Sequence, residues 1–128
     1  MNLKNLILTL VSILSLNFAL AGDFKTIEEA EFKQLLKTGK YTLIDVRTPQ
    51  ELDATGIISG AINIDFLAEN FDSKISELDK SKDYIIYCRS GRRSANASSK
   101  MVDIGLKALN LAGGMNGWLA NNNPTVKK

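Results

Sequence analysis

The chain has 128 residues, of which 45% are hydrophobic and 23% are charged, as is typical of one globular domain. It is too short for two large domains and too apolar for a disordered or fibrous chain. The 16 basic and 14 acidic residues give a net charge of +2. Because the basic residues form no long block, the charge pattern predicts no nucleic-acid partner.

The N-terminal residues differ from the rest of the chain. Residues 1–5 carry one Lys and no acid, and residues 6–16 are largely Leu, Ile and Val. Small residues follow at Ala19 and Ala21, where a signal peptidase would read them. A basic start, a short apolar run and small residues before a cleavage point are typical of a secretory signal peptide.

This pattern predicts cleavage after Ala21 and one mature domain at 22–128, located in the periplasm or otherwise exported. The apolar run is about half of the roughly 20 residues that cross a bilayer. Asp23 stands where a lipoprotein signal would have a Cys. We therefore expect no stable membrane association after cleavage, with a retained membrane anchor as the alternative.

One cysteine and no histidine narrow the possible chemistry. Cys88 is the only cysteine, so an internal disulfide, common in small exported domains, is excluded. A lone Cys in an oxidising compartment is either buried and inert or retained for its reactivity. The absence of His excludes Ser-His-Asp and Cys-His systems and His-containing zinc sites. We expect neither a metal nor another cofactor.

Hydrophobic periodicity and helix-stop residues predict alternating helices and strands. In the first half we expect a helix at 27–38 with Thr26 as N-cap and Glu29 as its reciprocal acid, a buried strand at 41–46, a short helix from Pro49 to near Gly56, a strand at 61–64 and a helical region at 66–78. In the second half we expect a strand at 84–87, a helix from an N-cap at Ser94 to about 104, a strand at 108–111, a helix at 116–120 and a frayed tail at 121–128. This order indicates an α/β fold with a mainly parallel sheet.

Residues 88–94, Cys-Arg-Ser-Gly-Arg-Arg-Ser, form the candidate site. Cys88 follows a predicted buried strand, and ligand sites in parallel sheets form beyond the carboxyl ends of the strands. The loop leads into a predicted helix, so backbone N–H groups can surround the sulfur as a cradle for an anion. Arg89, Arg92 and Arg93 also favour thiolate over thiol. A cysteine that only fills a core needs no such positive charge, which favours a reactive Cys88.

Three segments resemble signatures of the rhodanese-like single-domain sulfurtransferases, in that family's order and spacing. They are Ile-Asp-Val-Arg-Thr-Pro-Gln-Glu at 44–51, Tyr-Cys-Arg-Ser-Gly-Arg-Arg-Ser-Ala at 87–95 and Leu-Ala-Gly-Gly-Met-Asn-Gly-Trp at 111–118. The resemblance implies a five-stranded, mainly parallel sheet with helices on both faces. It also implies a thiosulfate:cyanide sulfurtransferase in which Cys88 carries a persulfide. A thiosulfate-like donor would load the sulfur, and cyanide, a thiol or a protein would accept it.

The resemblance further implies roles for individual residues. Cys88 would be the catalytic nucleophile, and the backbone of the loop would bind the negative sulfur. One loop arginine would face the donor and another would pair with Asp45 or Glu51, while Arg47 would contact the donor or brace the loop. The loop residues concerned are Arg89, Ser90, Gly91, Arg92, Arg93 and Ser94; Gly113 and Gly114 would allow a close turn beside them, and Trp118 would be a core or rim aromatic.

Two alternatives to the thiosulfate sulfurtransferase remain. The first is a sulfur carrier or protein-interaction module that passes sulfur to a partner without turnover on small acceptors. The second is a phosphatase or arsenate reductase of a related branch, in which the loop is one residue longer; here the sixth position after Cys88 is Ser94. The chain also departs from the family at 57–61, Ile-Ile-Ser-Gly-Ala in place of His-Ile-Pro-Gly-Ala, which predicts altered packing or substrate access there.

Overall fold

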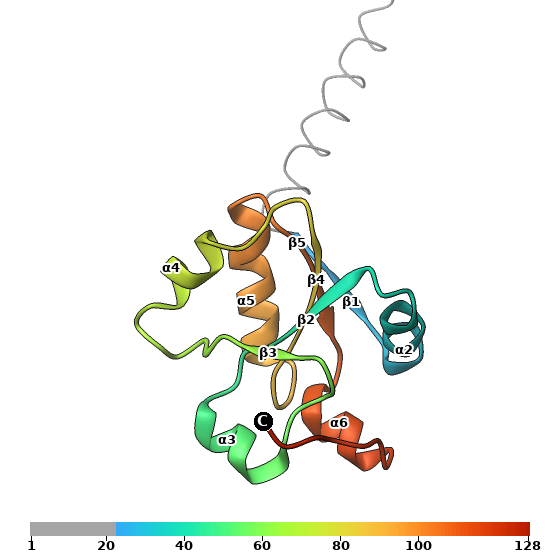
Figure 1. Ribbon diagram of the computed structural model, residues 1–128. Coiled ribbons are helices and arrows are strands. Elements are labelled where there is room, and N and C mark those ends of the chain that lie inside the picture. Colours follow the sequence, from blue (N-terminus) through green and yellow to red (C-terminus); the bar gives the residue numbers. More distant parts are fainter. Residues whose placement is uncertain (1–22) are drawn as a thin grey trace, which may run out of the picture.

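The computed structural model describes residues 23–128, so the predicted signal peptide lies outside the described residues. Helices and strands alternate along this part of the chain (Figure 1). The strands are β1 (Lys25–Ile27), β2 (Tyr41–Asp45), β3 (Ile62–Asn63), β4 (Asp83–Tyr87) and β5 (Lys107–Leu111). The helices are α2 (Glu29–Lys37), α3 (Pro49–Thr55), α4 (Phe71–Ser76), α5 (Arg92–Asp103) and α6 (Gly114–Ala120).

The five strands form one sheet in the order β1-β5-β4-β2-β3, and every neighbouring pair is parallel. The expected fold class is therefore confirmed. Because all strands run the same way, the residues that follow them gather at one edge. β4 lies at the centre of the sheet, and Cys88 follows it directly.

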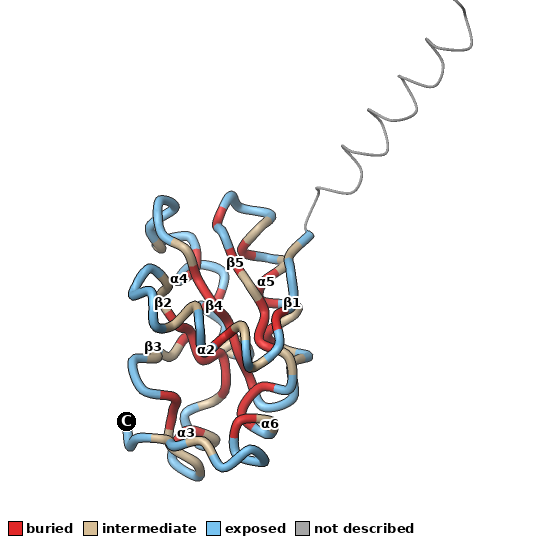
Figure 2. The backbone as a smooth tube through the Cα atoms, turned by 90° about the vertical axis from the view of Figure 1, so that its right-hand side faces the viewer, coloured by how far each residue is buried: buried red, intermediate tan, exposed pale blue. Residues whose placement is uncertain are grey.

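Helices cover both faces of the sheet (Figures 1 and 2). Side chains alternate along a strand, so Tyr84 and Ile86 of β4 pack toward α4 and α5, whereas Ile85 and Tyr87 pack toward α2 and α6. All four side chains are buried. Trp118 of α6 belongs to the second core and meets Phe32 edge-to-face, with the ring centroids 5.7 Å apart. The buried strands are the red segments in the middle of Figure 2.

The predicted start of the first helix is wrong. Thr26 is not a helix cap but the middle of β1, where it pairs with Asn110 of β5. The helix begins at Glu29, after an N-cap at Glu28. Ile27 is buried as a strand residue, so pairing with the sheet overrides the local cap signal.

Other predicted boundaries also shift. The strand expected at 61–64 is ladder-paired only at Ile62–Asn63, and the last helix begins at Gly114, not 116. The helical region expected at 66–78 is helical only at Phe71–Ser76. Phe66 instead donates its backbone N–H to the carbonyl of Val46, 3.0 Å away, so this end of the region continues the sheet edge.

The C-terminal tail is not frayed as predicted. Val126 and Ile57 form an antiparallel bridge, with backbone N···O distances of 2.8 and 2.9 Å. The Thr125 hydroxyl donates to the carbonyl of Thr55, and the Trp118 indole N–H donates to the carbonyl of Pro124, both at 2.8 Å. The tail is therefore tied to the end of α3.

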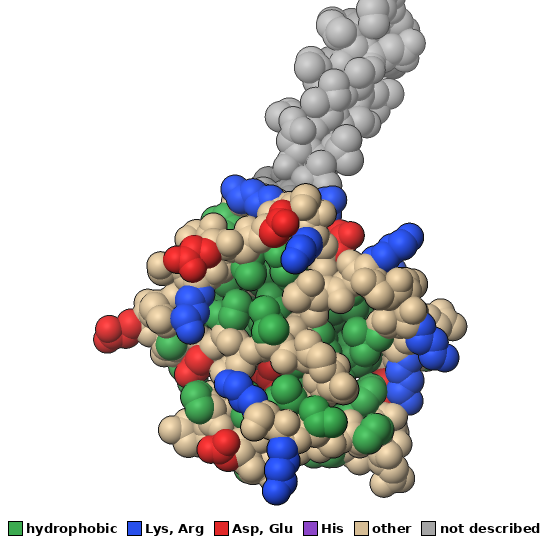
Figure 3. All heavy atoms as spheres, viewed as in Figure 1, with side chains coloured by type: hydrophobic (Ala, Val, Ile, Leu, Met, Phe, Trp, Pro, Cys, Tyr) green, Lys and Arg blue, Asp and Glu red, His purple; other side chains and the backbone are tan. Residues whose placement is uncertain are grey.

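Charged side chains of both signs are interspersed on the face shown in Figure 3. Within residues 23–128, no helix is long and apolar enough to cross a membrane. In the same range, no three His, Cys, Asp or Glu side chains are grouped as a metal ion would require.

Candidate active site

The sulfur of Cys88 lies at the carboxyl edge of the sheet, inside the loop that joins β4 to α5. Cys88 is 1% exposed. Gly91 ends the loop with φ +111°, in the left-handed region that glycine adopts at low cost. This turn starts α5 at Arg92, so the predicted N-cap at Ser94 is wrong: Ser94 lies within the first helical turn, and its buried side chain faces the loop.

Two donors lie within hydrogen-bonding distance of the sulfur. The Gly91 N–H donates to Cys88 Sγ over 3.0 Å, and the Ser94 hydroxyl donates over 3.3 Å. Burial raises the pKa of the Cys88 thiol. Hydrogen bonds from the Ser94 hydroxyl and from the backbone of Ser94, Gly91 and Ser90 lower this pKa by more than burial raises it, so the pKa of Cys88 lies below its ordinary value. The loop therefore favours the thiolate.

The start of α6 holds the other side of this loop. Backbone N–H groups of Met115 and Asn116 donate to the carbonyls of Cys88 and Arg89, over 2.8 and 3.0 Å. These bonds engage the carbonyls of Cys88 and Arg89 with α6, while the Gly91 N–H faces the sulfur. Gly114 makes this close approach possible, because a Cβ there would collide with both carbonyl groups.

Arg93 is paired with Glu51 of α3. Its two terminal nitrogens donate to the two Glu51 oxygens over 2.6 and 2.7 Å, a bidentate pair that joins α5 to α3. Glu51 also accepts from the backbone and hydroxyl of Thr48, both at 3.2 Å, in the capping box of α3. Mainly because of the Arg93 hydrogen bonds, the pKa of Glu51 falls to about 2.

Arg47 and Asp45 form a buried pair beneath α3. The guanidinium of Arg47 is 2.7 Å from Asp45 Oδ2, and both side chains are at most 1% exposed. Arg47 also donates to the Thr55 hydroxyl and the Gly56 carbonyl, at 2.8 and 2.9 Å. Burial lowers the pKa of Arg47, but the bonds and charge of Asp45 raise it more. In this structure Arg47 braces α3, and Asp45 pairs with Arg47, not with a loop arginine.

Tyr87 supports the segment that departs from the family pattern. Its hydroxyl oxygen accepts from the Ile58 N–H over 3.1 Å, and burial is the main cause that raises its pKa. Ile57 and Ile58 are both buried. Of the two residues that differ from the family pattern, Ile57 is buried directly after α3, whereas Ser59 is exposed. Sequence reasoning did not single out Tyr87 or the α6 amides, because an apolar strand pattern and backbone N–H groups carry no residue-type signal.

A cleft of about 190 Å³ opens beside the loop. Its lining comes from α3, from Arg89 and from the start of α6, and includes Ala54, Thr55, Met115 and Asn116. Arg89 and Arg92 are exposed, and neither forms an ion pair with any residue in the described range. Two unpaired cations therefore stand near the sulfur at the loop surface, which favours anionic ligands.

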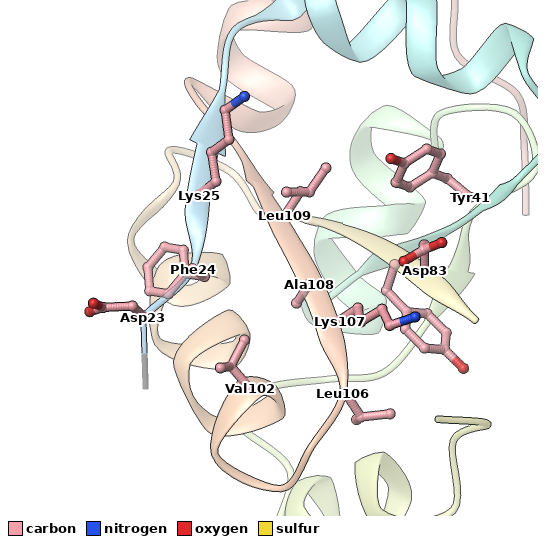
Figure 4. Close-up of a pocket in the computed structure, with 11 residues that line it drawn as sticks. Asp23, Phe24, Lys25, Tyr41, Asp83, Val102, Leu106, Lys107, Ala108 and Leu109 are labelled. Carbon is pink, nitrogen blue, oxygen red and sulfur yellow. The ribbon is translucent and has the colours of Figure 1, made fainter. Parts of the chain in front are cut away.

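A larger cavity, of about 340 Å³, lies at the opposite end of the sheet (Figure 4). Its lining includes the first residues of four strands, Lys25, Tyr41, Asp83 and Lys107. Several apolar side chains from α5 and β5 complete it, but none of its lining residues is a cysteine. The Cys88 loop therefore remains the candidate active site.

Comparisons with known proteins bear on the family to which the chain belongs. A family model described as "Rhodanese-like domain" matches residues 28–121. YtwF of Bacillus subtilis is 35% identical over 103 residues, which cover 80% of this chain and 97% of that protein. A protein named "Sulfurtransferase" from Allochromatium vinosum is 35% identical over 99 residues, 77% of this chain and 90% of that one.

A solved structure gives the same result at the level of the fold. The rhodanese-related protein of Thermoplasma volcanium superposes with a TM-score of 0.73 at 30% identity, covering 82% of this chain and all of that one. The chain therefore belongs to the rhodanese-like domain family, among relatives named as sulfurtransferases.

Proposed function

We propose that the protein is a thiosulfate sulfurtransferase that carries sulfane sulfur as a persulfide on Cys88 and passes it to cyanide or a thiol. The observation that supports this most directly is the position of Cys88 Sγ. It is buried, accepts hydrogen bonds from Gly91 and Ser94, and has a lowered pKa. A thiolate in such a cradle is an activated nucleophile.

The reaction would take place in two steps. In the first, the Cys88 thiolate attacks the outer sulfur of thiosulfate; the Sγ–S bond forms, and sulfite leaves with the electron pair of the broken S–S bond. In the second, the acceptor attacks the outer sulfur, and the electron pair of the Sγ–S bond returns to Sγ. Loop N–H groups would stabilise the negative sulfur in both states.

The charges beside the loop support an anionic donor. Arg93 is engaged by Glu51 and Arg47 by Asp45, so Arg89 and Arg92 would bind the donor. Arg89 also lines the cleft between α3 and α6. In a phosphate-ester enzyme of the related branch, an arginine at the end of a longer loop would hold the oxyanion. The pairing of Arg93 and the shorter loop favour sulfur transfer instead.

The location and the natural acceptor are part of the same proposal. The N-terminal pattern supports export and signal cleavage after Ala21, which would place the enzyme in the periplasm. There, a small thiol or a thiol-bearing protein would accept the sulfur, with cyanide as a laboratory substitute. We propose no nucleic-acid partner and no stable attachment to the membrane after cleavage.

Mass spectrometry of the intact protein tests the proposal. The protein is incubated with thiosulfate beside a Cys88→Ser variant, and cyanide is then added. We expect one additional sulfur atom on the Cys88 protein alone, and its removal by cyanide as thiocyanate. Sulfur that loads but turns over poorly would indicate a carrier module, and a failure to load would contradict sulfur transfer.

A further inference from the structure

The Ser94 hydroxyl is placed between two acceptors. Its Oγ lies 3.3 Å from Cys88 Sγ and 3.2 Å from the carbonyl oxygen of Gly91. A serine hydroxyl has one hydrogen to donate, so it can serve only one of these acceptors fully at a time. Ser94 is completely buried, so bulk water does not compete for this hydrogen.

The stronger acceptor changes during sulfur transfer. When Cys88 is a thiolate, Sγ carries the negative charge, and a hydrogen bond to an ion is about twice as strong as one to a neutral group. When Cys88 is a persulfide, the charge lies on the outer sulfur, and Sγ becomes a neutral bridging atom. The Gly91 carbonyl is then the better acceptor for the Ser94 hydroxyl.

From this geometry we propose that the Ser94 hydroxyl is a catalytic hydrogen-bond donor that alternates between Cys88 Sγ and the Gly91 carbonyl, and that it stabilises Sγ as the leaving group when sulfur passes to the acceptor. This inference rests on the proposed function. No proton is transferred to Sγ: the acceptor's electron pair forms the new bond to the outer sulfur, and the Sγ–S electron pair returns to Sγ as the Ser94 hydroxyl turns toward it.

Ser98 offers a matched control for Ser94. It lies one turn further along α5, is equally buried, and its Oγ has no hydrogen-bond partner in the described part of the chain. Ser94→Ala and Ser98→Ala therefore remove the same atom from the same helix. Only the first substitution removes a hydrogen bond to sulfur.

The test is single-turnover discharge of the persulfide. Each protein is loaded with thiosulfate, freed of excess donor, and mixed rapidly with cyanide, and thiocyanate is measured against time. We expect Ser94→Ala to slow discharge about tenfold, the size of one hydrogen bond to a charged group. This loss should hold across pH, because the persulfide sulfur Sγ carries no proton. Ser98→Ala should discharge at the rate of the unaltered protein.

A second measurement reads the free thiol without sulfur transfer. Iodoacetamide alkylation of Cys88 is followed against pH, and its midpoint should move to higher pH in Ser94→Ala but not in Ser98→Ala. Unchanged discharge in Ser94→Ala, or equal losses in both variants, would overturn the role of Ser94. A failure of the unaltered protein to load any sulfur would instead reject the proposed function, so the two failures are distinguishable.

Discussion

The arginines around Cys88 differ in what holds them. Arg47 is buried beneath α3, where it pairs with Asp45, and Arg93 of α5 forms an ion pair with Glu51 of α3. Neither is free to follow a substrate, since removing a carboxylate from either pair would leave a partly or fully buried charge without its partner. Arg89 and Arg92 are exposed. Two of the four arginines are therefore held by carboxylates, and the other two are exposed with no ion-pair partner among residues 23–128.

The Glu51–Arg93 pair predicts a dependence of stability on pH. The pKa of Glu51 falls from its ordinary value of 4.5 to about 2 in the folded protein. A carboxyl group with a lowered pKa stabilises the fold fully above its unfolded pKa. This contribution is lost as the pH falls from about 4.5 toward 2, because the unfolded chain takes up the proton first.

Glu51→Gln should therefore lower the free energy of unfolding by about 1–3 kcal/mol at pH 7, because Arg93 loses its charged partner. The difference from the unaltered protein should be smaller at pH 3. Urea unfolding of both proteins between pH 7 and pH 3 measures it. A difference that stays constant with pH would show that the charge of Glu51 does not stabilise the fold.

At the scale of elements, α6 fixes the loop through its backbone. Gly114 has φ +51°, and a Cβ on it would meet the carbonyls of Cys88 and Arg89. Gly117, in the same helix, has no atom within 4 Å of its would-be Cβ. The two glycines therefore differ in two respects: only Gly114 has a positive φ, and only Gly114 lies against the loop.

Gly114→Ala should destabilise the protein by about 2 kcal/mol or more, because it adds backbone strain and displaces the loop from α6. It should also slow sulfur loading by more than tenfold. Gly117→Ala should raise stability by about 0.5–1 kcal/mol through helix propensity and leave loading unchanged. Thermal unfolding and the loading rate measure both variants. Equal effects at the two positions would contradict the proposed contact.

The sequence predicts an element best where its local pattern and its tertiary setting agree. β4 was evident because a buried central strand is a continuous apolar run. The sequence does not reveal β1, because three residues at a sheet edge are too few to show a period and the pairing partner, β5, lies more than 80 residues away. The tail was misjudged because its order comes from contacts with Ile57 and Thr55.

The candidate site is likewise predicted where the local pattern decides the structure, and is not predicted where tertiary contacts decide it. The order of residues 88–94 indicates a thiol at the start of a turn, and the structure has that turn. The arginine that pairs with Glu51 is decided by how α3 lies relative to α5. Glu51 and its partner Arg93 are 42 residues apart in the sequence. The sequence predicts Ser94 as a helix cap because serine is common at N-caps. Its actual contact depends on where Gly91 turns the chain, which residue types alone do not fix.

At the scale of the whole molecule, the two ends of the sheet differ in character. The carboxyl end holds the buried polar groups of Asp45, Arg47 and Ser94 together with Cys88. The amino end is where the described chain begins, at Asp23, beside the cavity of Figure 4. The site and the first described residue, Asp23, are therefore at opposite ends of the parallel strands (Figure 1).

This separation predicts that residues 1–21 serve targeting alone. A chain comprising 22–128, expressed without residues 1–21, should fold and load sulfur on Cys88, because both cores and the Cys88 loop lie within it. Expression of the full chain in a Gram-negative bacterium should give a periplasmic protein whose intact mass is that of a chain beginning at Gly22. Full-length protein in the membrane fraction would instead support a retained anchor, with the Cys88 loop then facing away from the attachment point.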